Sequence, residues 1–203
     1  LSDVVIIPEV CVGSQTAVRS VVLATKLNNL KKVKRVALDD SSRTSIALVK
    51  IIFQEFLRCE PEWITSPPDL KSMLAQADAA LMIGDPAMTI SRDQFRVFDL
   101  ATLWHEFTGL GFVFAMWMGR KASADTCREI DFAGARNEGL AHLDEIAGTY
   151  EHPVGLSLSE IHDYLTRNIA FTMAEKMEKG LMLYFELSAK LKLIDSAKPL
   201  EFI

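Results

Sequence analysis

The chain has 203 residues, of which 49% are apolar, and a formal net charge of −5 at pH 7. This length allows one large domain or two small ones, and the apolar content is sufficient for a packed core. Because there is no excess of basic residues to neutralise phosphates, the charge argues against a nucleic-acid-binding protein.

Apolar and polar stretches alternate along the first part of the chain in a pattern typical of strands and helices. Strands are expected at residues 1–10, 18–25, 35–39, 62–65, 79–83, 95–98 and 112–117, with a loop at 11–16. Helices are expected at 43–58, 70–76 and 99–107, the last of which ends at Gly109. Strands that alternate with helices imply an α/β fold, with a parallel or mixed sheet and helices on its faces.

The pattern changes from Ser123 onward, where strand signals vanish. Helices are expected at residues 123–133, 134–150 and 159–193, the last with a break. The longest apolar run, 110–118, is too short to span a bilayer and is predicted to be a buried strand. No signal peptide opens the chain, which begins without Met in a strand-like segment, so we expect that N-terminal sequence is missing.

Cys11, Cys59 and Cys127 are scattered and odd in number. They show neither a disulfide framework nor metal-ligand spacing, which favours reduced thiols and a cytoplasmic location. The sequence has no GxGxxG, GxxxxGK[ST], GxSxG or CxxC element. Nucleotide, flavin and nicotinamide cofactors therefore have no support, and we expect neither a cofactor nor a metal.

A run of hydroxyl side chains around one guanidinium follows the strand expected at 35–39, and consists of Ser41, Ser42, Arg43, Thr44 and Ser45. A helix start has backbone N–H groups without intrahelical partners and a partial positive charge, so this run is suited to bind a carboxylate or phosphate. The alternative is an ordinary N-cap, for which one hydroxyl is enough. Arg43 has two options, to point into the site or to pair with Asp39 or Asp40.

Gly84 and Asp85 follow the strand expected at 79–83 and form a second candidate. Ligands of α/β sheets bind outside the carboxyl ends of the strands, so both turns are expected to face one crevice. The alternative here is a glycine turn in which the aspartate bonds its own backbone.

Several segments, in the right order and over nearly the whole chain, resemble the chorismate dehydratase family of the futalosine route to menaquinone. They are Val36–Asp39 with Ser41–Ser45, Ala79–Ala87, Asp99–Leu110 with Phe112–Ala115, Gly139–Leu143 and Tyr164–Ile169. The Ser-Ser-Arg-Thr-Ser element is fairly specific, because a sister family that makes dihydroxynaphthoate has a Thr-Thr-Ala type element there.

The resemblance implies a two-lobed clamshell fold like that of type II periplasmic binding proteins, with mixed sheets and a helical C-terminal part. One lobe would comprise residues 1–24 with 111–203, and the other, residues 25–110, would contain the anion site. The family also has an earlier segment with a Ser-Tyr-Leu-Asn element that forms part of the cleft wall. That segment has no counterpart in this sequence, so the catalytic residues are not assigned and are expected there.

The resemblance implies loss of water from chorismate, a small dianion, to give 3-[(1-carboxyvinyl)oxy]benzoate. The substrate-binding residues are expected to be Ser41, Ser42, Arg43, Thr44 and Ser45, with Ser14, Gly84 and Asp85 at the rim. No residue is an obvious base, and the enolpyruvyl carboxylate of the substrate is one option. A solute-binding protein without catalysis and the sister enzyme stay open as alternatives. Neither nucleic acid nor membrane is an expected partner, and a homodimer is left open.

Overall fold

The computed structural model describes residues 3–203, except for the side chains of residues 152 and 153. The chain divides into two compact units: unit 1 is Leu1–Thr16 with Leu110–Ile203, and unit 2 is Ala17–Gly109. None of the helices in this described part is long and apolar enough to cross a membrane.

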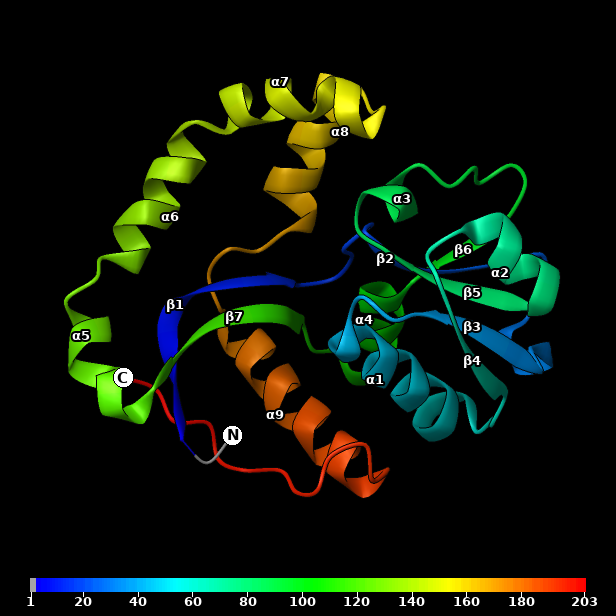
Figure 1. Cartoon of the computed structure of the whole chain (residues 1–203), viewed down its shortest axis with the longest axis horizontal. Coiled ribbons are helices and arrows are strands. Elements are labelled where there is room, and N and C mark those ends of the chain that lie inside the picture. Colours follow the sequence, from blue (N-terminus) through cyan, green and yellow to red (C-terminus); the bar gives the residue numbers. More distant parts are fainter. Residues whose placement is uncertain (1–2) are drawn as a thin grey trace. The chain divides into compact units, whose positions relative to one another are not determined.

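Unit 2 is built on a five-stranded sheet with the strand order β4-β3-β5-β2-β6 (Figure 1). The strands are β2 (Val21–Thr25), β3 (Arg35–Asp39), β4 (Glu62–Ser66), β5 (Ala79–Ile83) and β6 (Arg96–Asp99). β3 runs parallel to β4 and β5, whereas β2 is antiparallel to both β5 and β6. The carboxyl ends of β3, β4, β5 and β6 therefore lie on one edge of the sheet, together with the start of β2.

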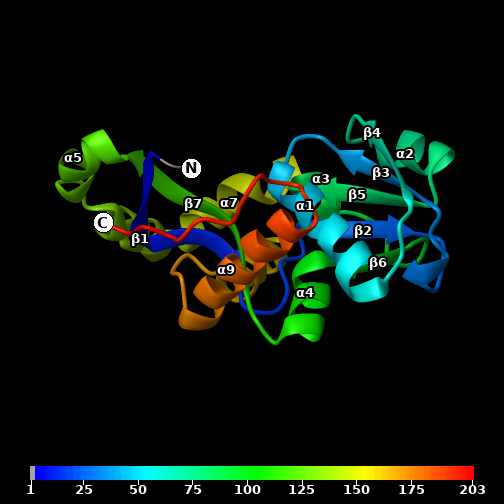
Figure 2. The same ribbon diagram turned by 90° about the horizontal axis from the view of Figure 1, so that it is seen from below.

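Helices cover both faces of this sheet (Figures 1 and 2). On one face, α1 (Arg43–Ile51) continues as the π-helical η2 (Ile52–Leu57), which packs against α4 (Leu100–Thr108). The other face carries α2 (Leu70–Gln76) and the short α3 (Asp85–Met88), and the 3-10 turn η1 (Leu30–Lys32) joins β2 to β3. Because both faces are covered, the central strands β2 and β5 are apolar at every position except Thr25 instead of alternating.

Unit 1 has a sheet of two strands among its described residues, β1 (Val4–Ser14) antiparallel to β7 (Phe112–Arg120). Its helices are η3 (Lys121–Ser123), α5 (Ala124–Arg128), α6 (Phe132–Ala141), α7 (Leu143–Val154), α8 (Leu158–Asp163), η4 (Tyr164–Asn168) and α9 (Glu175–Lys190). α9 packs on the sheet, where Met177 and Leu181 meet Cys11 and Val113.

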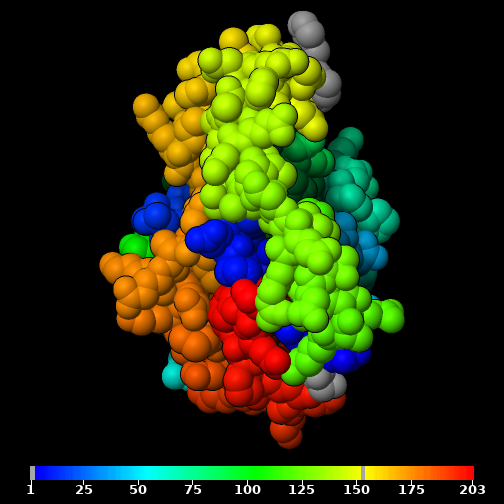
Figure 3. Space-filling model, turned by 90° about the vertical axis from the view of Figure 1, so that its left-hand side faces the viewer, coloured from blue at the N-terminus to red at the C-terminus, as the bar shows by residue number. Residues whose placement is uncertain are grey.

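The C-terminal tail of unit 1 lies beside β1 and shows in red next to the blue strand in Figure 3. Ile6 N donates to Glu201 O at 2.8 Å, and Ile203 N donates to Ile6 O at 3.2 Å. A salt bridge between Lys121 and Glu201 adds a side-chain contact at the same place. The tail is thus bonded to the sheet through its backbone.

Two predictions about the first 25 residues were wrong. Residues 11–14, expected in a loop at 11–16, belong to β1, which ends at Ser14. Gly13 is present because β1 packs closely against Met177, and not because the chain turns: a Cβ at Gly13 would lie 2.3 Å from Met177 Cε. Residues 17–24, expected in the lobe with the C-terminal helices, belong to unit 2. The reason is that β2 is hydrogen-bonded on both sides, to β5 and to β6.

Two predictions about unit 1 also differ from the structure. The strand expected to be buried at 112–117 extends to Arg120, and Trp117 in it is 58% exposed, because the described sheet has only one further strand. The single helix expected at 134–150 is broken at His142, whose φ of −109° and ψ of 22° are not helical. The expected break in 159–193 is present, between η4 and α9.

Candidate anion site

The edge of the unit 2 sheet at the carboxyl ends of its parallel strands collects most of the predicted site residues. The turn Ser41–Ser45 follows β3, and Gly84 and Asp85 follow the neighbouring β5. The pairing of Leu38 with Leu81 places these two turns level with each other. Seven of the eight predicted binding residues therefore lie on one edge of one sheet.

The start of α1 shows that part of the hydroxyl run is an ordinary helix cap. Ser42 is the N-cap, and its Oγ accepts from Ser45 N at 3.3 Å and donates to Ser45 Oγ at 3.1 Å. Ser45 is buried, at 1% exposure. Asp39 Oδ1 accepts from Ser41 N at 2.9 Å, which closes the turn before the helix. The N-cap alternative thus accounts for Ser42 and Ser45.

Three further polar side chains lie at this helix start. Ser41 and Arg43 are exposed, and Thr44 is half-buried. Within the described chain, Arg43 forms no ion pair with Asp39 or Asp40, and as the first residue of α1 it has one of the N–H groups that lack an intrahelical partner. The positive end of the helix and an exposed guanidinium therefore face solvent together, which favours a bound anion.

Gly84 and Asp85 form a tight turn between β5 and α3. Gly84 has a φ of 72° and a ψ of −151°, and its N–H donates to Ser20 O at 2.7 Å. Asp85 is exposed and is the first residue of α3, whose N-cap Gly84 makes no side-chain cap hydrogen bond. Its negative charge disfavours a ligand carboxylate and suits a donor such as a ligand hydroxyl group.

Ser14 is the predicted residue that belongs to unit 1. It is the last residue of β1 in unit 1, pairs with Phe112, and is 1% exposed. Its predicted place at the rim of the anion site stays a prediction.

Asp99, at the carboxyl end of β6, is a residue of this edge that sequence reasoning missed. Its Oδ1 accepts from the N–H groups of Ala101 and Thr102 at 2.9 and 3.0 Å, which caps α4. Its Oδ2 accepts from the N–H groups of Val18 and Arg19 at 3.0 and 2.6 Å. The sequence gives a local signal for the helix cap, because an aspartate precedes a helical pattern that ends at Gly109. It gives none for the bonds from Val18 and Arg19, which lie about 80 positions away from Asp99.

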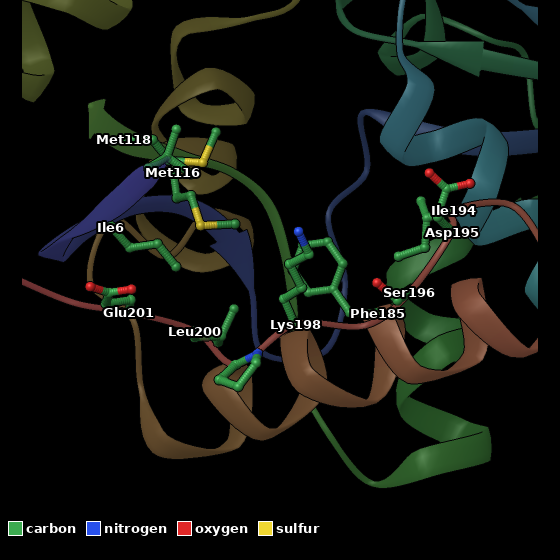
Figure 4. Close-up of a pocket in the computed structure, with 12 residues that line it drawn as sticks. Ile6, Met116, Met118, Phe185, Ile194, Asp195, Ser196, Lys198, Leu200 and Glu201 are labelled. Carbon is green, nitrogen blue, oxygen red and sulfur yellow. The ribbon is translucent and has the colours of Figure 1, made fainter. Parts of the chain in front are cut away.

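Unit 1 contains two apolar cavities that suit an anion less well. One, of about 260 Å³, is lined by Met116, Met118, Phe185 and the C-terminal tail, with Lys198 as the ammonium group in its wall (Figure 4). The other, of about 700 Å³, lies between the sheet and helices α6 and α7. Burial raises the pKa of Cys11 in its wall to about 11, so this thiol is protonated at neutral pH and is a poor nucleophile.

The described residues contain no cluster of three or more His, Cys, Asp or Glu side chains that fits a metal ion. The chemistry of the unit 2 edge is instead that of hydroxyl groups, backbone N–H groups and one guanidinium. These donors bind carboxylates directly.

Comparison with known proteins gives both a family and a fold. Residues 1–190 match the model of a family described as menaquinone biosynthesis. Chorismate dehydratase from Thermus thermophilus is 31% identical over 180 residues, which are 77% of this chain and 64% of the relative. The chain thus spans somewhat less than two thirds of that relative's length.

Two solved structures are similar over nearly the whole chain. A protein from Archaeoglobus fulgidus has a TM-score of 0.60 and 18% identity, covering 95% of this chain and 74% of its own. The periplasmic aliphatic sulphonate binding protein from Escherichia coli has a TM-score of 0.57 and 13% identity, covering 96% and 70%. These likenesses confirm the predicted α/β fold of the periplasmic-binding-protein type.

Proposed function

Because this chain belongs to the menaquinone biosynthesis family, we propose that it acts in the dehydration of chorismate to 3-[(1-carboxyvinyl)oxy]benzoate. The observation that carries the proposal is the 31% identity to a chorismate dehydratase over 180 residues. The donors at the start of α1 supply a physical reason, because chorismate is a dianion and this is where the chain offers an anion site.

The reaction removes a ring proton and a ring hydroxyl group as water and leaves an aromatic ring. The proton lost is gamma to the unsaturated ring carboxylate, so negative charge spreads into that carboxylate as the C–H bond breaks. Donors that are already in place stabilise such charge without reorganisation. Ser41, Arg43 and Thr44, with the N–H groups of the α1 start, are the proposed partners of the ring carboxylate.

We assign no residue of this chain as the general base. The enolpyruvyl carboxylate of the substrate is the proposed proton acceptor, since it is part of the same molecule and needs no protein group. The carboxylic acid formed in this way gives the proton to the departing hydroxyl group, so that one water leaves as the aromatic ring forms. Asp85, exposed at the same edge, is the proposed partner of the ring hydroxyl group.

The first test is to incubate the chain with chorismate and to follow the products by chromatography and mass spectrometry. Loss of one water with the appearance of an aromatic absorbance supports the proposal. An outcome with neither turnover nor binding of chorismate favours the alternatives, the sister enzyme or a solute-binding protein, and for the latter the likeness to the sulphonate binding protein is the specific observation.

The substitution Thr44→Ala tests the anion site itself. Loss of one hydrogen bond to a charged group costs about 1.5–3 kcal/mol, so we expect the dissociation constant of chorismate to rise about 10- to 100-fold. Thr149→Ala in α7 is the matched control, because that hydroxyl donates to Ile146 O at 2.7 Å within unit 1. A Thr44→Ala chain that binds chorismate as tightly as the parent contradicts the proposed site.

A cytoplasmic location is also part of this proposal. Its support is the state of Cys11, Cys59 and Cys127, which are all free thiols, as is usual in a reducing compartment. Cell fractionation tests the location. Light scattering of the purified chain tests the homodimer that the sequence leaves open.

A further inference from the structure

A single carboxylate in unit 2 connects two segments that are distant in the sequence. Asp99 accepts four backbone N–H groups, two from the first turn of α4 and two from the turn before β2. A helix cap needs only the first two: Asp69 caps α2 in the same way, and its other oxygen accepts from Ser72 Oγ in the same turn. The bonds to Val18 and Arg19 are therefore additional to the capping role.

The turn that Asp99 holds has an uncommon backbone conformation. Arg19 has a φ of 64°, in the left-handed region that residues other than glycine seldom adopt. Its N–H makes the shortest of the four bonds to Asp99, 2.6 Å, and a carboxylate acceptor makes such a bond strong. Asp99 thus stabilises a conformation that the chain would otherwise disfavour.

The same turn reaches the candidate anion site through one more hydrogen bond. Ser20, the residue after Arg19, accepts from Gly84 N at 2.7 Å through its carbonyl oxygen. Gly84 ends the strand next to β3 and lies level with the Ser41–Ser45 turn. Two hydrogen bonds therefore connect Asp99 to Gly84: Arg19 N donates to the Asp99 carboxylate, and Gly84 N donates to the carbonyl oxygen of Ser20, the next residue.

We propose that Asp99 is a positioning residue of the anion site, which fixes the Val18–Ser20 turn and through it the Gly84–Asp85 turn beside the hydroxyl run. The inference rests on the proposed function, because it concerns the same bound dianion. Asp99 does not touch the substrate in this scheme. It acts by holding the backbone on which Asp85 is placed.

The test compares Asp99→Ser with Asp69→Ser. Serine keeps one oxygen for the helix cap but has no second oxygen for Val18 and Arg19. Asp69→Ser is the matched control, because it changes a cap of the same kind that bonds no distant segment. Asp99→Asn, which keeps the shape of the side chain, replaces Asp99→Ser if that variant does not fold.

Two readouts separate positioning from general stability. Amide hydrogen exchange is expected to become about tenfold faster at Arg19 and Gly84 in Asp99→Ser, with β3 amides such as Leu38 unchanged. The dissociation constant of chorismate is expected to rise about 10- to 100-fold in the same variant, because small misplacements of a binding group have effects of this size. Asp69→Ser is expected to change neither.

The outcomes distinguish this inference from the proposed function. An unchanged rate of amide hydrogen exchange at Gly84 in the Asp99 variant would show that Asp99 does not fix the Gly84–Asp85 turn. Faster exchange with an unchanged dissociation constant overturns the positioning role while leaving chorismate binding intact. A parent chain that does not bind chorismate overturns the proposed function, and the role of Asp99 in binding it as well.

Discussion

The two units bury their sheets to very different extents. All five residues of β2 in unit 2 are buried, whereas β7 in unit 1 is buried only at its first two positions. Among the residues that the structure describes, ten large apolar side chains are exposed in unit 1 and one, Phe107, in unit 2. Burial follows from the number of neighbouring strands and helices, and not from the apolar content of a strand.

The two units also differ in the kinds of chemical group that they expose. Unit 2, with both faces of its sheet covered, has a group of hydroxyl groups and one guanidinium at the edge where the anion site is proposed. Unit 1 presents two apolar cavities with exposed apolar side chains, Trp117 and Leu140 at one cavity and Met118 at the other. Surfaces of this kind are typical of contacts with other polypeptide or apolar groups.

The largest expected effect comes from truncating the same residue type in each unit. Trp104 is fully buried in unit 2, where its ring meets Phe56 at 6.0 Å, whereas Trp117 is 58% exposed. We expect Trp104→Ala to lower the free energy of unfolding of unit 2 by about 3–5 kcal/mol. Trp117→Ala is expected to lower that of unit 1 by less than about 1 kcal/mol, since surface substitutions have small effects.

Urea unfolding of both variants, followed by hydrogen exchange in each unit, measures these values. Equal losses in the two units would show that Trp117 is buried in solution, for example against a second copy of the chain. The difference in burial between the two units would then hold only for a single copy of the chain.

The second effect is a loss of stability of unit 1 at alkaline pH. Burial raises the pKa of Cys11 from 9.0 to about 11 and that of Tyr184 from 10.0 to about 12, and both residues belong to unit 1. The folded state keeps these protons after the unfolded state has lost them, so stability is fully present below pH 9 and falls as the pH rises towards about 12. Each group accounts for about 2–3 kcal/mol.

Urea unfolding at a series of pH values, with exchange in α9 and β5 as reporters of the two units, checks this expectation. Cys11→Ala and Tyr184→Phe are expected each to remove their own share of the pH dependence. An equal alkaline loss in β5 would contradict the assignment to unit 1.

The smallest effect concerns two helix glycines and shows that unit 1 also has a tightly packed part. A Cβ at Gly180 in α9 would lie 2.0 Å from the Gly111 carbonyl oxygen, whereas one at Gly148 in α7 would meet nothing within 4 Å. Gly180→Ala is expected to destabilise unit 1 by about 1–3 kcal/mol. Gly148→Ala is expected to stabilise it by about 0.4–1 kcal/mol, because alanine favours a helix.

Thermal unfolding of the two variants shows whether each substitution raises or lowers the stability of unit 1. A neutral Gly180→Ala would show that α9 moves away from β7 at little cost, and unit 1 would then lack a rigid part.

Local signals predicted the elements whose ends are set by their own residues. The helix at 70–76 begins after Asp69, whose side chain accepts from Lys71 N, and β5 occupies the predicted residues 79–83. Gly13 was misread as part of a loop because the reason for a glycine there is the side chain of Met177, more than 160 positions away. Contacts of this kind have no periodicity that a single sequence reveals.

The same distinction holds for the candidate site. Alternation of strands and helices was enough to place Ser41–Ser45 and Gly84–Asp85 on one edge, because strand ends in such sheets converge. The bonds from Asp99 to Val18 and Arg19 depend on the position of the antiparallel β2 between β5 and β6, which the sequence pattern did not indicate. The proposed binding roles of these residues stay predictions until chorismate binding is measured.

The order of strands along the chain has a consequence for biosynthesis. All strand partners in unit 2 lie within one continuous run, Ala17–Gly109, so this unit completes its sheet as soon as that run has left the ribosome. β1 must wait for β7, whose paired residues follow it by about 100 positions. At roughly 5–20 residues per second this interval lasts roughly 5–20 s, during which the apolar Val4–Ile7 lacks the partner strand that it has in the described structure and is a natural target for chaperones.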